Sequence, residues 1–176
     1  FATPQIDVEA CKGCGACALV CPHLAIQLKA FEYEPLSQTV QGYKPEVEEL
    51  KSRAISPVVL VFCCQWAEFS ALDRVKDGFT REDVAIIEIP CFDALDPVHV
   101  LEAFHVGFDG VLAIICSDGD CKLKEGRETA ERNILALEKV LNKLNLKERF
   151  EVFKTSPRYI DGFDSKLGSF VSKIAK

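Results

Sequence analysis

The sequence contains no methionine, one tryptophan and three histidines in 176 residues. Its longest apolar stretches, at residues 57–66 and 110–116, fall well short of the roughly 18 consecutive apolar residues typical of a membrane span. Lysine and arginine number 21 against 27 aspartates and glutamates, and they form no basic stretch suited to nucleic acid or anionic lipid. We therefore expect neither direct membrane insertion nor a nucleic-acid partner.

Three common functional motifs are also missing. No G-x-G-x-x-G follows an apolar run, and the sequence contains neither a P-loop nor a nucleophile elbow. These absences argue against a nucleotide cofactor and against hydrolytic chemistry, and we assign no catalytic residue. Because the chain begins at Phe1 and has no methionine, we expect it to be a segment of a longer polypeptide.

Cysteine is abundant, and its nine copies are grouped along the chain, which favours metal binding over disulfides. The first group lies in residues 11–22 (CKGCGACALVCP), which has the C-x2-C-x2-C-x3-C-P spacing of bacterial ferredoxins. Gly13 and Gly15 allow backbone N–H groups to approach cluster sulfides where a side chain would clash. The run predicts a [4Fe–4S] cluster, with these ligands: Cys11, Cys14, Cys17 and Cys21.

The chain has only one such run. In ferredoxins with two runs, the cysteine before proline ligates the other cluster. Cys21 therefore either closes its own cluster or serves a second one, whose run lies upstream or in a partner chain. We favour the second interpretation, in which residues 1–30 are the second half of a two-cluster module. Residues 31–56 have the composition of a linker, with a short helix possible at 45–53.

The remainder alternates between short apolar runs and helical patterns. Continuous apolar runs predict strands at residues 58–62, 84–89, 111–115 and 150–153. Apolar residues at helical spacing predict helices at 96–108, 125–144 and 163–174. This order predicts an α/β domain over residues 57–176, with a flavodoxin-like parallel sheet and flanking helices.

The other five cysteines follow the predicted strands. Cys63 and Cys64 come after the first strand, Cys91 after the second, and Cys116 and Cys121 after the third. Parallel strands share one direction, so all five thiols are expected at one carboxyl edge of the sheet. Five thiols are one more than a four-ligand cluster needs.

Adjacent residues of an extended chain point to opposite sides, so one thiol of the Cys63–Cys64 pair is expected to be spare. The predicted ligand set is Cys91, Cys116 and Cys121 with one of that pair, taken as Cys64. The turn around Gly119 could donate backbone N–H groups to the sulfur atoms.

Four segments resemble the delta-subunit family of methyl-viologen-reducing hydrogenase, whose members are associated with heterodisulfide reductase. The segments are residues 62–66 (FCCQW), 89–91 (IPC), 109–112 (DGVL) and 116–121 (CSDGDC), within a similar region of about residues 58–142. The resemblance implies one [2Fe–2S] cluster and electron transfer between a hydrogenase or dehydrogenase and a heterodisulfide-reductase-type flavoprotein. A ferredoxin run followed by this domain is similar to the fused arrangement found in some relatives.

We therefore predict an electron-transfer component of a multi-subunit redox complex, without a substrate site of its own. It would carry a [4Fe–4S] and a [2Fe–2S] cluster and work in a reducing, anaerobic cytoplasm. Two alternatives use the same thiols. One is a dithiol/disulfide oxidoreductase acting through Cys116 and Cys121 or through Cys63 and Cys64. The other is a zinc-stabilised interaction domain.

Overall fold

In the computed structural model, the described residues are 5–19, 21–23, 25–26, 33–64, 81–117, 121, 124–155 and 162–175. Within them lies a four-stranded parallel sheet in the order β2-β1-β3-β4. Its strands are β1 (Val59–Cys64), β2 (Val84–Ile89), β3 (Gly110–Cys116) and β4 (Phe150–Thr155). The predicted α/β class, parallel sheet and flavodoxin-like strand order are confirmed.

Strands β1 and β3 form the centre of the sheet and are buried along their whole lengths. Their continuous runs of apolar residues suit a strand that is covered on both faces. Val59 pairs with Gly110, and the register continues to Cys63 opposite Ile114. The two central strands therefore run side by side to the same edge of the sheet.

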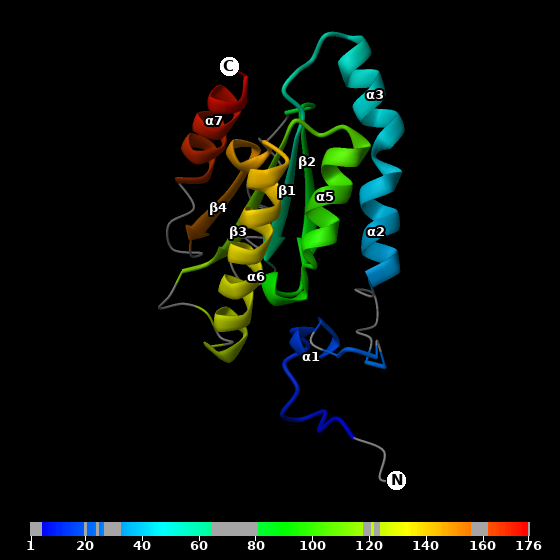
Figure 1. The fold of residues 1–176 in the computed structure, drawn as a ribbon, viewed down its shortest axis with the longest axis vertical. Helices are drawn as coiled ribbons and strands as arrows, with labels where there is room; N and C mark the ends of the chain where they lie inside the picture. Colours follow the sequence, from blue (N-terminus) through cyan, green and yellow to red (C-terminus); the bar gives the residue numbers. More distant parts are fainter. Residues whose placement is uncertain are drawn as a thin grey trace.

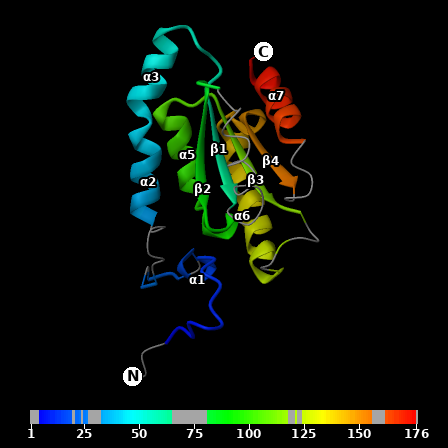
Figure 2. The same ribbon diagram turned by 180° about the vertical axis from the view of Figure 1, so that it is seen from behind.

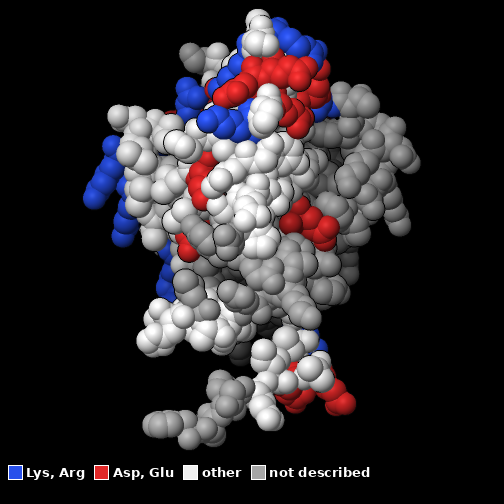
Figure 3. Space-filling view, turned by 90° about the vertical axis from the view of Figure 1, so that its right-hand side faces the viewer, with Lys and Arg blue, Asp and Glu red and all other residues white. Residues whose placement is uncertain are grey.

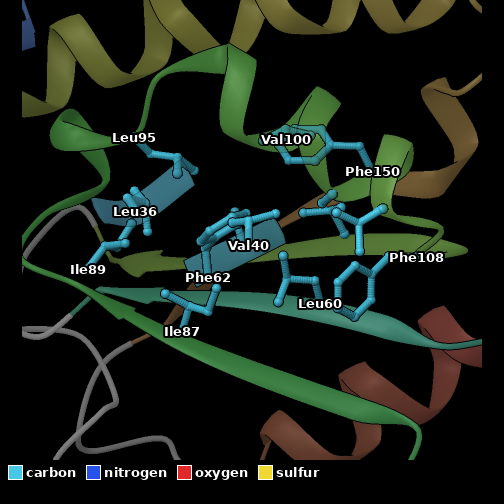
Figure 4. Close-up of a cluster of buried hydrophobic side chains, with 14 of the residues drawn as sticks. Leu36, Val40, Leu60, Phe62, Ile87, Ile89, Leu95, Val100, Phe108 and Phe150 are labelled. Carbon is cyan, nitrogen blue, oxygen red and sulfur yellow. The ribbon is translucent and has the colours of Figure 1, made fainter. Parts of the chain in front are cut away.

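Helices cover both faces of the sheet, as the two opposite views show (Figures 1 and 2). On one face lie α5 (Pro97–Val106) and α6 (Lys124–Lys143), and on the other lies α7 (Gly162–Ile174). Figure 4 shows part of the core between the sheet and the α5–α6 face, where Phe62 of β1 and Val100 of α5 belong to one cluster of buried side chains. All three helices were predicted, with ends that differ by only a few residues.

Helix α5 begins with a cap formed by Asp96. The Asp96 side chain accepts a hydrogen bond from the Val98 N–H at 2.8 Å, and Nδ1 of His99 accepts one from the Asp96 N–H at 3.1 Å. The helix ends at Gly107, whose φ of 116° lies in the left-handed region favoured by glycine. His99 is therefore a buried residue that contributes to the cap.

Two further helices, α2 (Tyr33–Gly42) and α3 (Lys44–Ser52), precede the sheet. Helix α3 was predicted, but α2 was not, because only Leu36 and Val40 mark its apolar side. Both of these residues are buried in the core cluster that includes α5. Ser37 Oγ also donates a hydrogen bond to Glu102 Oε1 of α5 at 2.6 Å. Packing against α5 thus stabilises a helix whose own sequence signal is weak.

At the amino edge of the sheet, Asp109 joins three segments. Its carboxylate accepts hydrogen bonds from the Val58 N–H at 2.9 Å, from Lys51 Nζ at 3.0 Å and from Ser56 Oγ at 3.3 Å. These contacts connect the end of α3 and the start of β1 to the start of β3. At this end of the molecule, Figure 3 shows acidic and basic side chains mixed together.

Three short helices complete the described elements: α1 (Ala16–Leu19), η2 (Phe92–Ala94) and η3 (Lys147–Arg149). Within the described ranges, each helix is too short or too polar to cross a bilayer.

Gly110 marks the close approach of α7 to β3, and substituting it tests that packing. A Cβ at this position would lie 2.6 Å from Ile174 Cδ1 and 2.9 Å from Phe170 Cε1. We expect Gly110→Ala to lower the free energy of unfolding by about 1–3 kcal/mol, measured by denaturant titration. Gly168→Ala is the matched control in α7, because a Cβ there meets no atom within 4 Å. It should leave stability unchanged or raise it by up to about 1 kcal/mol. Equal destabilisation by both variants would contradict the close approach.

Candidate metal centres

The sheet carries its cysteines at one edge. Cys64 is the last residue of β1 and Cys116 the last of β3, and these two strands are neighbours. Cys91 follows the end of β2 by two residues, and Cys121 lies just beyond β3. From β1 the chain passes to β2 on one side of β1 and then crosses to β3 on its other side. Cys64 and Cys116 therefore flank the point where the strand order reverses. Open α/β sheets commonly build their binding sites there.

Cys64 and Cys116 form a close pair of thiols. Their Sγ atoms lie 3.7 Å apart, and both residues are buried. Two thiolates bound at about 2.3 Å to one tetrahedral metal are separated by about 3.8 Å. The pair therefore fits two ligands of one tetrahedral metal ion without a change in backbone position.

The neighbouring thiols act electrostatically on Cys116. Its hydrogen bond with Cys64 raises the pKa of the Cys116 thiol strongly, and burial raises it further. Electrostatic interactions with Cys64, Cys121 and Cys91 raise the pKa of Cys116 in the same direction. Such a group resists ionisation by itself, whereas a bound cation reverses this effect and favours thiolates. The chemistry of the donor set therefore suits a metal or an iron–sulfur cluster.

Cys63 is placed differently. Its Sγ lies 3.9 Å from the carbonyl oxygen of Cys64, and the residue is fully buried in the core beneath α7, a cluster that also includes Cys64 and Cys116. The close thiol contact to Cys116 belongs to Cys64. Among the described residues, no three His, Cys, Asp or Glu side chains surround a single point closely enough to hold one ion. The turn at Gly119 lies outside the described residues, although Cys121 N–H donates to Ser117 O at 3.1 Å across it.

The first cysteine group spans a loop and α1, with Cys11 and Cys14 before the helix, Cys17 within it and Cys21 after it. Cys11 and Cys17 are exposed, whereas Cys14 and Cys21 are partly buried. None of the nine cysteines, all of which the structure describes, forms a disulfide.

Backbone conformation in this loop agrees with the role expected of its glycines. Gly13 has a φ of 65° and Gly15 a φ of 86°, backbone conformations that residues other than glycine rarely adopt. The Ala25 N–H donates to Cys21 Sγ at 3.4 Å, an interaction of the kind that stabilises a thiolate ligand.

Asp7 organises the start of this loop, and it was not predicted as a functional residue. Its Oδ1 accepts hydrogen bonds from Glu9 N at 3.0 Å and Ala10 N at 3.3 Å, and its carbonyl accepts one from Cys11 N at 2.8 Å. The available signal was an aspartate four residues before the first cysteine, because aspartate side chains readily bond to backbone N–H groups that follow.

The two cysteine groups lie at the same end of the molecule. Helix α1, which contains Cys17, packs against η2, and η2 begins directly after Cys91. Figure 1 shows α1 beyond the end of the sheet to which the strand arrows point. The N-terminal loop therefore faces the cysteine-bearing edge and is remote from the amino edge around Asp109.

Comparison with protein families gives two matches in different parts of the chain. Residues 59–176 match the family described as methyl-viologen-reducing hydrogenase, delta subunit. Residues 4–27 match the family described as 4Fe-4S binding domain. The first match covers the whole sheet with its five cysteines, and the second covers the first cysteine group.

Individual relatives fall into two kinds. An iron-sulfur subunit of the F420-non-reducing hydrogenase vhc of Methanococcus voltae is 31% identical over 96 residues, which cover 53% of this chain and 67% of that protein. An iron-sulfur subunit of the F420-non-reducing hydrogenase of Archaeoglobus profundus is 32% identical over 94 residues, which cover 51% of this chain and 67% of that protein. A component of the ferredoxin:CoB-CoM heterodisulfide reductase of Methanosarcina mazei is 28% identical over 204 aligned positions, which cover 97% of this chain and 25% of that protein. The chain thus spans about a quarter of the length of this last relative.

The raised pKa of Cys116 predicts slow alkylation in the metal-free, reduced chain. The thiolate is the species that reacts. At a pH below the pKa, each unit by which the pKa rises lowers the thiolate fraction about tenfold. With iodoacetamide near pH 8, peptide mass spectrometry should show Cys116 reacting more than about tenfold more slowly than exposed Cys17. Cys64→Ala removes the largest cause of the shift and should accelerate the reaction of Cys116. In full denaturant the two residues should react alike, and equal rates in the folded chain would contradict the geometry.

Proposed function

The chain belongs to the delta-subunit family of methyl-viologen-reducing hydrogenase through residues 59–176, and we propose that it is an iron–sulfur electron-transfer module. In this proposal it relays electrons between a hydrogenase or dehydrogenase partner and a heterodisulfide-reductase-type flavoprotein. The observation that carries the proposal is the buried Cys64–Cys116 pair, coupled to Cys91 and Cys121 at the switch point of the sheet. Its relatives are named as subunits of hydrogenases and of heterodisulfide reductases, so a multi-subunit complex is proposed here too.

For the first centre, we propose that Cys11, Cys14 and Cys17 hold a [4Fe–4S] cluster. The match of residues 4–27 to a 4Fe-4S binding domain supports this assignment, as do the left-handed glycines of the loop. Cys21, which already accepts an amide hydrogen bond, would be the fourth ligand or would serve a neighbouring cluster. Asp7 would hold the loop in the conformation that presents Cys11.

For the second centre, the proposed ligands are Cys64, Cys91, Cys116 and Cys121, and the proposed group is a [2Fe–2S] cluster. Bound there, an iron–sulfur cluster supplies reversible one-electron chemistry. Cys63 is left out of the set because its thiol lies against a carbonyl oxygen in the core. Rigid strands position Cys64 and Cys116, and their burial keeps water away from the sulfur atoms.

The arrangement of the two cysteine groups also supports a relay. Packing of α1 against η2 keeps both groups at one end of the molecule, which suits a module whose two redox centres exchange electrons. The chain's own residues supply ligands, burial and backbone N–H groups, while the partners supply the substrate sites. A reducing, anaerobic cytoplasm is the proposed location, because thiolate-bound iron persists there.

The dithiol alternative has one observation in its favour, namely the 3.7 Å separation of Cys64 and Cys116. This pair differs from the two pairs that the sequence suggested. Neighbouring thiols raise the pKa of Cys116, however, whereas a catalytic thiol needs a lowered pKa to provide its thiolate. The electron-transfer proposal is therefore the stronger of the two.

Single cysteine variants test the ligand assignment. The anaerobically reconstituted chain should hold about six irons, and dithionite reduction should give separate low-temperature EPR signals from a cubane and a [2Fe–2S] centre. Cys116→Ser or Cys64→Ser should remove the [2Fe–2S] signal and leave the cubane signal, because each deletes one proposed ligand. Cys14→Ser should have the reverse effect.

Cys63→Ser is the matched control, since it alters the adjacent thiol of the same strand and should retain both signals. Loss of the [2Fe–2S] signal in this variant, but not in Cys64→Ser, would reverse the assignment of the pair. A chain that binds zinc and no iron, or that binds no metal and reduces disulfides, would overturn the electron-transfer proposal.

A further inference from the structure

A short chain of hydrogen bonds joins α2 to α5. Ser37 Oγ donates to Glu102 Oε1 at 2.6 Å, and Gln41 Nε2 donates to Ser37 Oγ at 3.1 Å. Ser37 is only 7% exposed, and its helix neighbours Leu36 and Val40 are buried in the core cluster shown in Figure 4. The hydrogen bond to Glu102 is therefore a directional contact beside buried apolar side chains.

The second oxygen of Glu102 is left without a partner. Oε2 is buried and forms no hydrogen bond. An unpaired buried polar atom costs free energy, and an apolar residue at this position would avoid that cost. Stability alone therefore does not explain an acidic side chain here. Buried polar contacts can instead select one arrangement among several that apolar packing would allow.

Helix α2 connects the sheet domain to the first cysteine group. Its C-terminal end leads into α3, whose Val47 and Leu50 are buried in the core. Its N-terminal end points toward α1, as the two opposite views show (Figures 1 and 2). Ser37 lies in the N-terminal half of α2. The Ser37–Glu102 contact therefore holds the part of α2 that leads to the first cysteine group.

Docking on α5 decides both the stability and the direction of α2. The helix has ten residues, fewer than the roughly 12–15 at which an isolated helix becomes stable. Burial of Leu36 and Val40 favours docking but defines the tilt and rotation of α2 weakly, because the hydrophobic effect is non-directional. A hydrogen bond has a preferred geometry and so adds the missing direction.

We propose that Ser37 and Glu102 are positioning residues, which fix the orientation of α2 on α5 and thereby hold the first cysteine group beside the cysteine-bearing edge of the sheet. Packing of α1 against η2 completes this placement. The inference rests on the proposed electron transfer, since it concerns the distance between the two proposed centres. Ser37 and Glu102 contact neither centre and act through α2.

Spin relaxation in the anaerobically reconstituted and reduced chain measures this distance. A fast-relaxing cubane accelerates the relaxation of a nearby [2Fe–2S] signal, and the effect falls with the sixth power of the distance. We expect such acceleration in the parent chain relative to Cys14→Ser, which removes a cubane ligand. Ser37→Ala deletes the hydrogen bond and should lower the acceleration several-fold. Glu102→Gln keeps an acceptor for the Ser37 hydroxyl and should retain the acceleration.

Two further variants separate orientation from stability. In the metal-free chain, Ser37→Ala should speed amide hydrogen exchange of residues 33–42 several-fold. Adding Glu102→Leu replaces the polar pair with apolar groups, a change that is often neutral or stabilising. This double variant should regain slow exchange without regaining the spin relaxation of the parent, because apolar packing restores docking but no direction. Thr39→Ala is the matched control, since it removes an exposed hydroxyl of α2 that bonds to the Pro35 carbonyl, and it should change neither measurement.

Three results would overturn the proposal. Ser37→Ala could keep the accelerated relaxation of the parent. The double variant could regain both slow exchange and the parent's relaxation, which would show that apolar packing is sufficient. The parent could hold both centres and show no acceleration relative to Cys14→Ser, which would place the first cysteine group away from the edge.

A chain that binds no iron would contradict the proposed electron transfer instead. The exchange measurements need no metal, so they would still test the role of Ser37 and Glu102. Unchanged exchange of residues 33–42 in Ser37→Ala would then overturn the proposal.

Discussion

The common direction of the four parallel strands is the constraint on which the candidate centre depends. Because β1 and β3 are adjacent and run the same way, residues 52 positions apart in the chain meet at one edge as Cys64 and Cys116. Any disturbance of that pairing moves a thiol away from its neighbour. The amino edge contributes indirectly, since Asp109 connects the starts of both strands and so helps to set their register. The pairing of β1 with β3 therefore also determines the positions of the candidate ligands.

Burial of these thiols has opposite consequences with and without a cation. In the absence of a cation, the hydrogen bond with Cys64, desolvation and repulsion by neighbouring thiols disfavour the ionised form, and the pKa of Cys116 rises. When a cation binds, the same burial excludes competing water and strengthens the attraction between metal and thiolate. The first cysteine group depends less on burial, because two of its thiols are exposed. Hydrogen bonds from backbone N–H groups order its loop instead. One chain thus positions thiols both on rigid strands and in a loop.

Much of this architecture could be predicted from the sequence because local and tertiary signals agree. The apolar runs at β1 and β3 require burial on both faces, and the Asp96–Pro97 start of α5 is a local cap that does not depend on its surroundings. Helix α2 escaped prediction because Leu36 and Val40 acquire their role only when α5 lies beside them. The sequence could show that one thiol of the Cys63–Cys64 pair is spare, but the contact of Cys64 with Cys116 becomes visible only in the fold, because adjacent thiols differ only in the neighbours that the fold provides.

The segment that follows β2 connects the two cysteine groups. Cys91 is a candidate ligand, and η2, which begins directly after it, packs against α1, the helix that contains Cys17. Phe92 of η2 is itself buried in the core that α5 and α6 cover. The position of η2 is therefore fixed by the packing of the domain core, and through α1 the same packing bears on the first cysteine group. Cys64 and Cys116 depend instead on the pairing of β1 with β3, so the candidate ligands at the sheet edge are positioned by two different parts of the fold.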